Sequence, residues 1–170
     1  MVITKNTQKT HLGFLQVFLD GVTAGFTQGG ATITIEKETS SIQVDDFGTA
    51  PVDVVVQGTG ATVEVNFAQI EPEVISLVVP EGTLTASGTF EVGATAGTSL
   101  LGLAKQLVLS GTNGVTSQQW TFHKAFVEAG TEIPYNQEDQ SVLTVPFRVV
   151  PDPDRLSDSD ALFKYENFTT

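Results

Sequence analysis

The chain has 170 residues, with 20 acidic against 8 basic side chains and a formal net charge of −12. It contains no cysteine, which excludes disulfides, thiolate metal sites and a cysteine nucleophile. The basic residues are scattered along the chain. A surface that grips nucleic acid through its phosphates is therefore excluded as well.

The length predicts a single domain, residues 1–170, with a core large enough to be stable without staples. Apolar stretches fall short of the roughly 20 residues that a membrane-spanning helix needs. The run Leu12–Leu19 is short and interrupted by Gln16, so we do not expect a signal peptide. We expect a soluble protein without a membrane partner.

The first part of the chain predicts an arm followed by two strands. Residues 1–10 are polar and are expected to form a flexible amino-terminal arm. Leu12–Leu19 predicts a buried strand. Residues 31–37 alternate between apolar and polar side chains, which predicts a strand with Ile33 and Ile35 facing inward.

A long segment from Ser41 to Asp53 interrupts the strand pattern. Strand character resumes over residues 52–57. Gly58-Thr59-Gly60 then predicts a hairpin turn into residues 61–68, which show the clearest two-residue period in the chain.

One short helix is predicted from Ile70 to Val78. Pro72 suits the first turn, and the acidic residues nearby favour the positive end of the helix dipole. Ile70, Val74 and Val78 fall on one side, as packing on a sheet requires.

The second half predicts further strands. Residues 84–92 read as a weak strand and residues 93–102 as a small, flexible segment. Residues 103–110 predict a strand, and Asn113-Gly114 is a strong hairpin signal. Residues 120–127 would then pair antiparallel with the preceding strand.

The stretch from Gln119 to Asp154 contains two strand-like runs. The first places Trp120, Phe122 and Phe126 on one face, which predicts core packing. The second covers residues 142–150. Because Pro146 has no N–H to donate, we expect this strand to have a side free of main-chain pairing, forming an exposed sheet edge.

The carboxy-terminal arm, residues 151–170, is acidic and broken by prolines, yet it carries several large apolar side chains. A disordered tail would lack them, so we expect this arm to dock on its own domain or on a neighbour. The residues concerned are Leu162, Phe163, Tyr165 and Phe168.

Catalytic chemistry finds little support in the sequence. His123 has no GxSxG elbow or HExxH partner nearby, so a hydrogen-bonded or solvated strand histidine is expected. The acidic series near the carboxy terminus offers candidate calcium ligands, but Arg155 and Leu156 interrupt it. We therefore predict no enzyme activity, no cofactor and no metal. The acidic series comprises Asp152, Asp154, Asp158 and Asp160.

Abundant Thr, Val and Gly with one short helix predict an all-β fold. The sequence resembles the major tail tube proteins of long-tailed bacteriophages and related prophages. The similarity is carried by Trp120–Phe126, Val145–Arg148, the Pro151–Asp154 turn leading to Leu162–Lys164, Ala50–Val52, and Gly60–Phe67 with its following helix.

This resemblance implies a mainly antiparallel β-sandwich or partial barrel with one short flanking α-helix. It implies homo-hexameric rings that stack into a hollow tube, through which DNA passes during ejection into the host. The implied partners are further copies of the chain, the tape measure protein and other tail proteins, with DNA only as non-specific cargo in the lumen. The implied location is the virion tail, assembled in the host cytoplasm.

The resemblance also implies where copies meet. Residues 41–56 would form a long loop that reaches an adjacent subunit or ring, and both arms would make contacts between subunits. It transfers no catalytic residues. The expected interface residues are Asp45, Asp46, Phe47, Pro51, Val52, Pro146, Pro151, Leu162, Phe163, Tyr165 and Phe168.

Two other classes of protein stay open at this point. One is a calcium- or carbohydrate-binding β-sandwich module of a bacterial surface protein. The other is a different virion component, such as a tail terminator or head decoration protein.

Overall fold

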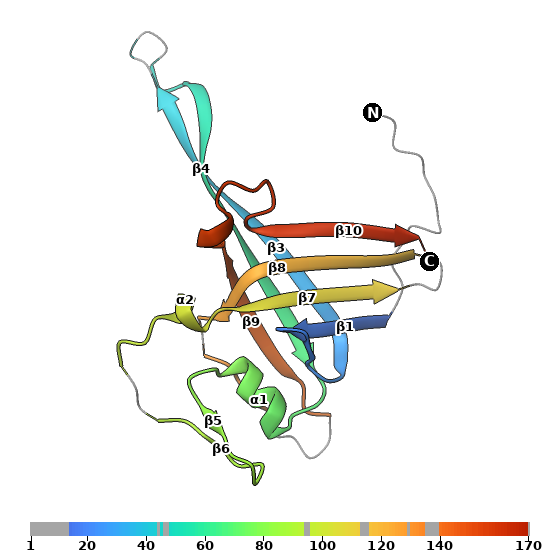
Figure 1. Cartoon of the computed structure of the whole chain (residues 1–170). Coiled ribbons are helices and arrows are strands. Elements are labelled where there is room, and N and C mark those ends of the chain that lie inside the picture. Colours follow the sequence, from blue (N-terminus) through green and yellow to red (C-terminus); the bar gives the residue numbers. More distant parts are fainter. Residues whose placement is uncertain are drawn as a thin grey trace.

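The structure is a computed structural model that describes residues 14–43, 45, 48–93, 96–112, 116–128, 130–134 and 140–169 (Figure 1). These residues form antiparallel strands with few helical turns. The strands are β1 (Phe14–Leu19), β2 (Val22–Thr23), β3 (Thr27–Gln43), β4 (Pro51–Phe67), β5 (Thr83–Leu84), β6 (Phe90–Glu91), β7 (Lys105–Thr112), β8 (Thr116–Val127), β9 (Leu143–Val150) and β10 (Phe163–Thr169). The helices are α1 (Pro72–Val78), α2 (Leu100–Leu103) and the 3-10 turn η3 (Pro153–Arg155).

An 8-stranded sheet in the order β2-β1-β7-β8-β9-β4-β3 dominates the fold, and β10 adds to β8. The strand β8 joins the two halves of this sheet. Its first part, up to Phe122, pairs with β10, and its last part, from Lys124, pairs with β9. The beginning of β3 returns to β1, where the Thr27 hydroxyl lies 3.5 Å from the Leu15 carbonyl oxygen. The sheet thus curves round one core, which confirms the predicted all-β fold class.

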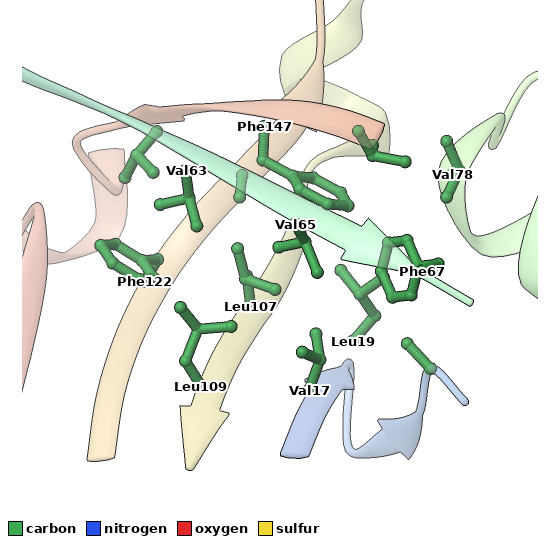
Figure 2. Close-up of a cluster of buried hydrophobic side chains, with 14 of the residues drawn as sticks. Val17, Leu19, Val63, Val65, Phe67, Val78, Leu107, Leu109, Phe122 and Phe147 are labelled. Atoms are coloured by element: carbon green, nitrogen blue, oxygen red, sulfur yellow. The ribbon is translucent and has the colours of Figure 1, made fainter. Parts of the chain in front are cut away.

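The core lies on the inner face of this curved sheet (Figure 2). Phe67, Phe122 and Phe147 are its largest fully buried side chains, and leucines and valines of β1, β4, β7 and β9 fill the space between them. Two-residue alternation along each strand produces this arrangement, because successive side chains point to opposite faces. In β9 the alternation is regular from Leu143 to Val149.

The predicted helix is confirmed, with Pro72 as its first residue. Val74 and Val78 are buried, and Ile70 packs against the core from just before the helix. Among the described residues, no helix is long and apolar enough to cross a membrane.

The predicted turn at Gly58-Thr59-Gly60 is wrong, because β4 runs straight through it. Glu38 pairs with Gly58 and Thr39 with Val56, so Gln57 is an extra residue in a β-bulge. The long partner strand β3 keeps the glycines extended. The long loop expected over residues 41–56 is likewise wrong: both ends of that range are strand, and β3 and β4 form one long hairpin.

Several smaller expectations also need correction. Ile35 lies on the same face of β3 as Ile33 and opposite the buried Ala61, as predicted, but at 45% exposure it is not covered as Ile33 is. The weak strand expected at 84–92 is a small hairpin of β5 and β6 that turns at Gly88, whose φ is +78°. Part of the segment expected to be flexible, 93–102, enters α2. The arm 1–10 and the Asn113-Gly114 turn lie outside the described residues, although the antiparallel pairing of β7 with β8 is confirmed.

The aromatic face predicted for β8 is correct only for its first part. Leu107 pairs with Phe122 and Lys105 with Ala125, so a bulge places an extra residue in β8. The side chains of β8 that face the core are therefore Phe122 and, after the bulge, Ala125. Phe126 does not lie on this face and is half-buried.

The exposed edge expected at β9 is wrong. β4 pairs with β9 on one side and β8 pairs with it on the other. The local effect of Pro146 is real, however, because the ladder with β8 begins only at Phe147.

Replacing Phe67 by alanine tests the core. This side chain is fully buried, so Phe67→Ala should lower the free energy of unfolding by about 3–5 kcal/mol. Urea unfolding followed by circular dichroism measures the change. The control is Val92→Ala, at a position that is 56% exposed, which should be nearly neutral. Equal stability of the two variants would contradict this description of the core.

Candidate assembly surfaces

The outer half of the β3–β4 hairpin projects away from the body of the domain (Figure 1). Main-chain pairing holds it together, with Ser41 opposite Val54 and Thr39 opposite Val56. It nevertheless carries a run of apolar side chains that no other part of the described structure covers. Ile42, Val52, Val54, Val55 and Val56 are all about half exposed.

Three of these valines form what we call the valine face: Val52, Val54 and Val56. They alternate along β4 with Asp53 and Val55. Each is between 52% and 54% exposed. Through the cross-strand pairs, this face continues the side of β3 that carries Ile35. A strand face that is apolar yet uncovered is typical of a contact surface for another molecule.

The strand β3 ends the strand order, and β4 pairs with it from Thr27 to Gln43 apart from the bulge at residues 28–30. Among the described residues, no strand pairs with the other edge of β3. Such an edge is a template for pairing with another strand, and isolated proteins usually blunt it. The length of β3 therefore favours association.

The carboxy-terminal arm docks on its own subunit. β10 pairs with β8, placing Phe163 opposite Phe122 and Tyr165 opposite Trp120. The Trp120 ring lies 4.6 Å from that of Tyr165 and 5.6 Å from that of Phe163, centroid to centroid. This aromatic cluster fixes β10, while Tyr165 and Phe168 remain 44% and 46% exposed.

The turn that leads into β10 is held by charges. The Arg155 guanidinium donates to both carboxylate oxygens of Asp160, at 2.9 and 3.0 Å. The Asp152 carboxylate accepts from the Asp154 N–H at the start of η3. The hydrogen bond from Arg155, aided by the positive charge of that side chain, lowers the pKa of Asp160 against the opposing effect of burial.

His123 lies beneath this turn, at the bulge in β8. Its side chain is buried, and its Nε2 is 3.6 Å from Asp160 Oδ2 without a hydrogen-bond partner. Among the described residues, Nε2 of His123 is neither exposed to solvent nor hydrogen-bonded. The prediction of a solvated or hydrogen-bonded histidine is therefore wrong for this atom. In the described part of the chain, no three His, Asp or Glu side chains gather as metal ligands would. Arg155 is the cation that Asp158 and Asp160 face.

The predicted interface residues fall into two groups and some isolated positions. Asp45, Pro51 and Val52 are exposed on the hairpin, while Asp46 and Phe47 lie outside the described residues. The members on β10 and just before it lie together: Leu162 and Phe163 pack partly against the core, and Tyr165 and Phe168 are exposed. Pro146 is half-buried within β9, and Pro151 is exposed.

Sequence reasoning missed Ile35, Ile42 and the exposed valines from Val54 to Val56. The signal was present as Val52-Asp53-Val54-Val55-Val56, where apolar side chains occupy both faces of one strand. A strand with one face in water would alternate.

A domain with a projecting hairpin and a long unpaired strand edge has the architecture of a protein built for assembly. The sequence model of the phage tail tube protein family matches residues 21–159, which is most of the chain. The chain therefore belongs to the phage tail tube protein family and is a structural component of a phage tail.

Two other comparisons complete this result. No curated protein matches the chain. Among solved structures, a chain in the cryo-EM structure of the anti-feeding prophage (AFP) baseplate, 6-fold symmetrised, is similar, with a TM-score of 0.46 and 10% sequence identity, covering 98% of each chain.

The Arg155–Asp160 pair generates a pH prediction. Because its pKa is lowered in the folded state from 3.8, Asp160 contributes stability above that value, and the contribution is lost as pH falls through the lower folded value. Asp160→Asn should therefore reduce the free energy of unfolding at neutral pH, and the deficit should shrink below the ordinary aspartate pKa.

Chemical denaturation of both proteins between about pH 7 and pH 2 measures this deficit. Asp154→Asn, which removes an exposed carboxylate from the same turn, is the matched control. A deficit that is independent of pH would show that the ion pair is not its cause.

Proposed function

We propose that this chain is the repeating subunit of the tail tube, acting as one domain over residues 1–170. Copies form homo-hexameric rings, the rings stack, and phage DNA leaves the virion through the channel. The observation that carries this proposal is the β3–β4 hairpin, which combines an unpaired strand edge with an uncovered valine face. Membership of the tail tube family supports it.

Pairing of β3 explains how a ring could close. The free edge of one copy takes up a strand of the next, which satisfies its main-chain groups. A contact between two different surfaces of identical subunits repeats round a ring when the rotation closes. Six copies of one curved sheet then share a continuous wall round the channel.

The valine face supplies apolar contact between copies. Burying a valine side chain fully stabilises by roughly 1.5–3 kcal/mol, so three half-exposed valines offer a few kcal/mol per contact before the costs of association. The contact is repeated at every subunit of a ring. A binding free energy of modest size at each hairpin therefore suffices for a stable tube.

We propose further contacts between subunits from the residues that sequence reasoning selected. Asp45 and Pro51 are exposed beside the end of the hairpin. Asp46 and Phe47, which lie outside the described residues, are proposed as contacts with them. Pro151, Tyr165 and Phe168 offer exposed surface near the carboxy-terminal arm. Pro146, Leu162 and Phe163 are less exposed, so their contribution is confined to the surface that they leave open. The amino-terminal arm, residues 1–10, is proposed to reach a neighbour as well.

The strongly acidic composition suits a channel for DNA. A net charge of −12 on each copy repels the phosphate backbone, so DNA is carried without being bound. In this proposal the tape measure protein and other tail proteins are partners, DNA is non-specific cargo, and assembly takes place in the host cytoplasm. The role is structural and not catalytic.

Electron microscopy of the purified chain across a concentration series tests the function. We expect six-fold rings, and tubes with an open channel at higher concentration, because edge and hairpin contacts are satisfied only between copies. A monodisperse monomer at every concentration would overturn the proposal.

Shortening the hairpin tests its part in assembly. Ser41 and Val54 are paired, so replacing residues 42–53 by Asn-Gly should close the ribbon with a two-residue turn at an intact pair. We expect circular dichroism and thermal unfolding close to those of the full chain, since the removed residues lie outside the core, but no tubes. Replacing the β5–β6 turn residues 86–88 by Asn-Gly is the control and should leave tubes intact. Normal tubes from the shortened hairpin would contradict its assigned role.

A further inference from the structure

We propose that a charge-free socket at the root of the hairpin receives the valine face of a second copy, head to tail. This inference rests on the proposed tube function and names the surface at which copies stack. The socket is a groove of about 530 Å³ beside the start of β3, with Leu15, Phe26, Thr27 and Gln69 among its lining residues.

A glycine bulge makes room for the socket. Thr27 pairs with Phe67 and Ala31 with Val65. Between these two pairs β3 has more residues than β4, which makes a bulge in β3. Gly29 and Gly30 lie in this bulge and have φ of +81° and +80°, a conformation that other residues rarely adopt. A side chain on Gly30 would meet no atom within 4 Å. Among the described residues, none places a side chain beside Gly30, which leaves the groove open there.

Phe26 marks the socket as a contact surface. It is 70% exposed, although an aromatic ring of this size is costly to leave in water. Its carbonyl oxygen accepts from the Ala68 N–H at 2.8 Å, so its backbone is held in place. An exposed aromatic side chain on a fixed backbone, beside a groove, is suited to anchor a partner in a protein interface.

Charge decides which occupant fits. None of the described residues that line the socket is charged, although the chain carries 20 acidic side chains. Two copies at −12 repel each other, and close contact is least costly where both surfaces lack acids. The valine face is the matching surface: Val54 and Val56 pair with Ser41 and Thr39. Asp53 lies on the other face of β4.

Geometry requires the two surfaces to come from different copies. The socket lies where β3 begins and β4 ends, and the valine face lies in the other half of the same ribbon, near the beginning of β4. Figure 1 shows that this outer half of the ribbon projects away from the body. At about 3.3 Å per residue, roughly 40 Å separates the socket from the valine face. A contact between opposite ends of identical molecules is heterologous, so it closes into a ring when its rotation closes and extends into an open stack when it does not. We assign the contact between socket and valine face to the open, stacking direction.

Adding a charge to the socket tests the contact. Phe26→Glu should raise the subunit concentration needed for tubes by at least about tenfold, because it buries an unpaired carboxylate against the valine face. Val92→Glu is the matched control: the same change in charge at an apolar residue that is 56% exposed, on the β5–β6 side of the domain. It should assemble like the unmodified chain.

A cross-link identifies the occupant. The chain has no cysteine, so Phe26→Cys combined with Val54→Cys should form disulfides between copies on mild oxidation, read on a non-reducing gel. Val92→Cys with Val54→Cys should not. Normal assembly of Phe26→Glu, or absence of the first cross-link in assembled tubes, would overturn the socket.

The same measurements separate the other occupants. Suppose that residues 1–13 or a small apolar ligand filled the groove. Phe26→Glu would then lower the melting temperature of the unassembled subunit or leave tubes unaffected, and no cross-link would form. Either result counts against a second copy as the occupant. Failure of the unmodified chain to assemble at all overturns the tube proposal. The cross-link between concentrated free subunits would still decide whether socket and valine face meet.

Discussion

The main-chain ladder between β3 and β4 is the interaction on which the rest of the structure depends. Near the body, β9 and the core support this ladder. Farther out, in the described part of the chain, the two strands pair only with each other, yet the pairing continues to Gln43 and Pro51. An isolated two-stranded ribbon is marginal in water. The exposed valines and the edge of β3 are thus two aspects of one feature, a ribbon that extends beyond the support of the core.

Local patterns predicted those elements whose environment is decided locally. The helix at α1 follows from Pro72 and the spacing of Val74 and Val78, and β9 follows from strict alternation. The continuous path of β4 could not be read in this way. Gly58 and Gly60 resemble a turn until the pairing with Glu36 and Glu38 is known, and that pairing depends on residues distant in the sequence.

The candidate surfaces were predicted in outline and missed in detail. The resemblance located the hairpin region and the carboxy-terminal arm, but burial could not be deduced from it. Docking of β10 depends on the packing of the Tyr165 and Phe163 rings, both tilted, against Trp120, and the spacing of residues in the sequence does not reveal it. The Arg155–Asp160 pair likewise requires the turn to fold back on itself. Three of the four acidic residues that suggested a cation site in the sequence, Asp152, Asp158 and Asp160, are instead bonded or ion-paired within the chain.

The bulge at Gln57 and the glycines beside it have a mechanical consequence. Gly58 and Gly60 pair with Glu38 and Glu36, so at these two pairs only β3 contributes side chains to the ribbon. A Cβ at Gly60 would have no atom within 4 Å. The ribbon is therefore least stiff where it leaves the body. A force on the hairpin tip bends the ribbon at this joint before it deforms the core.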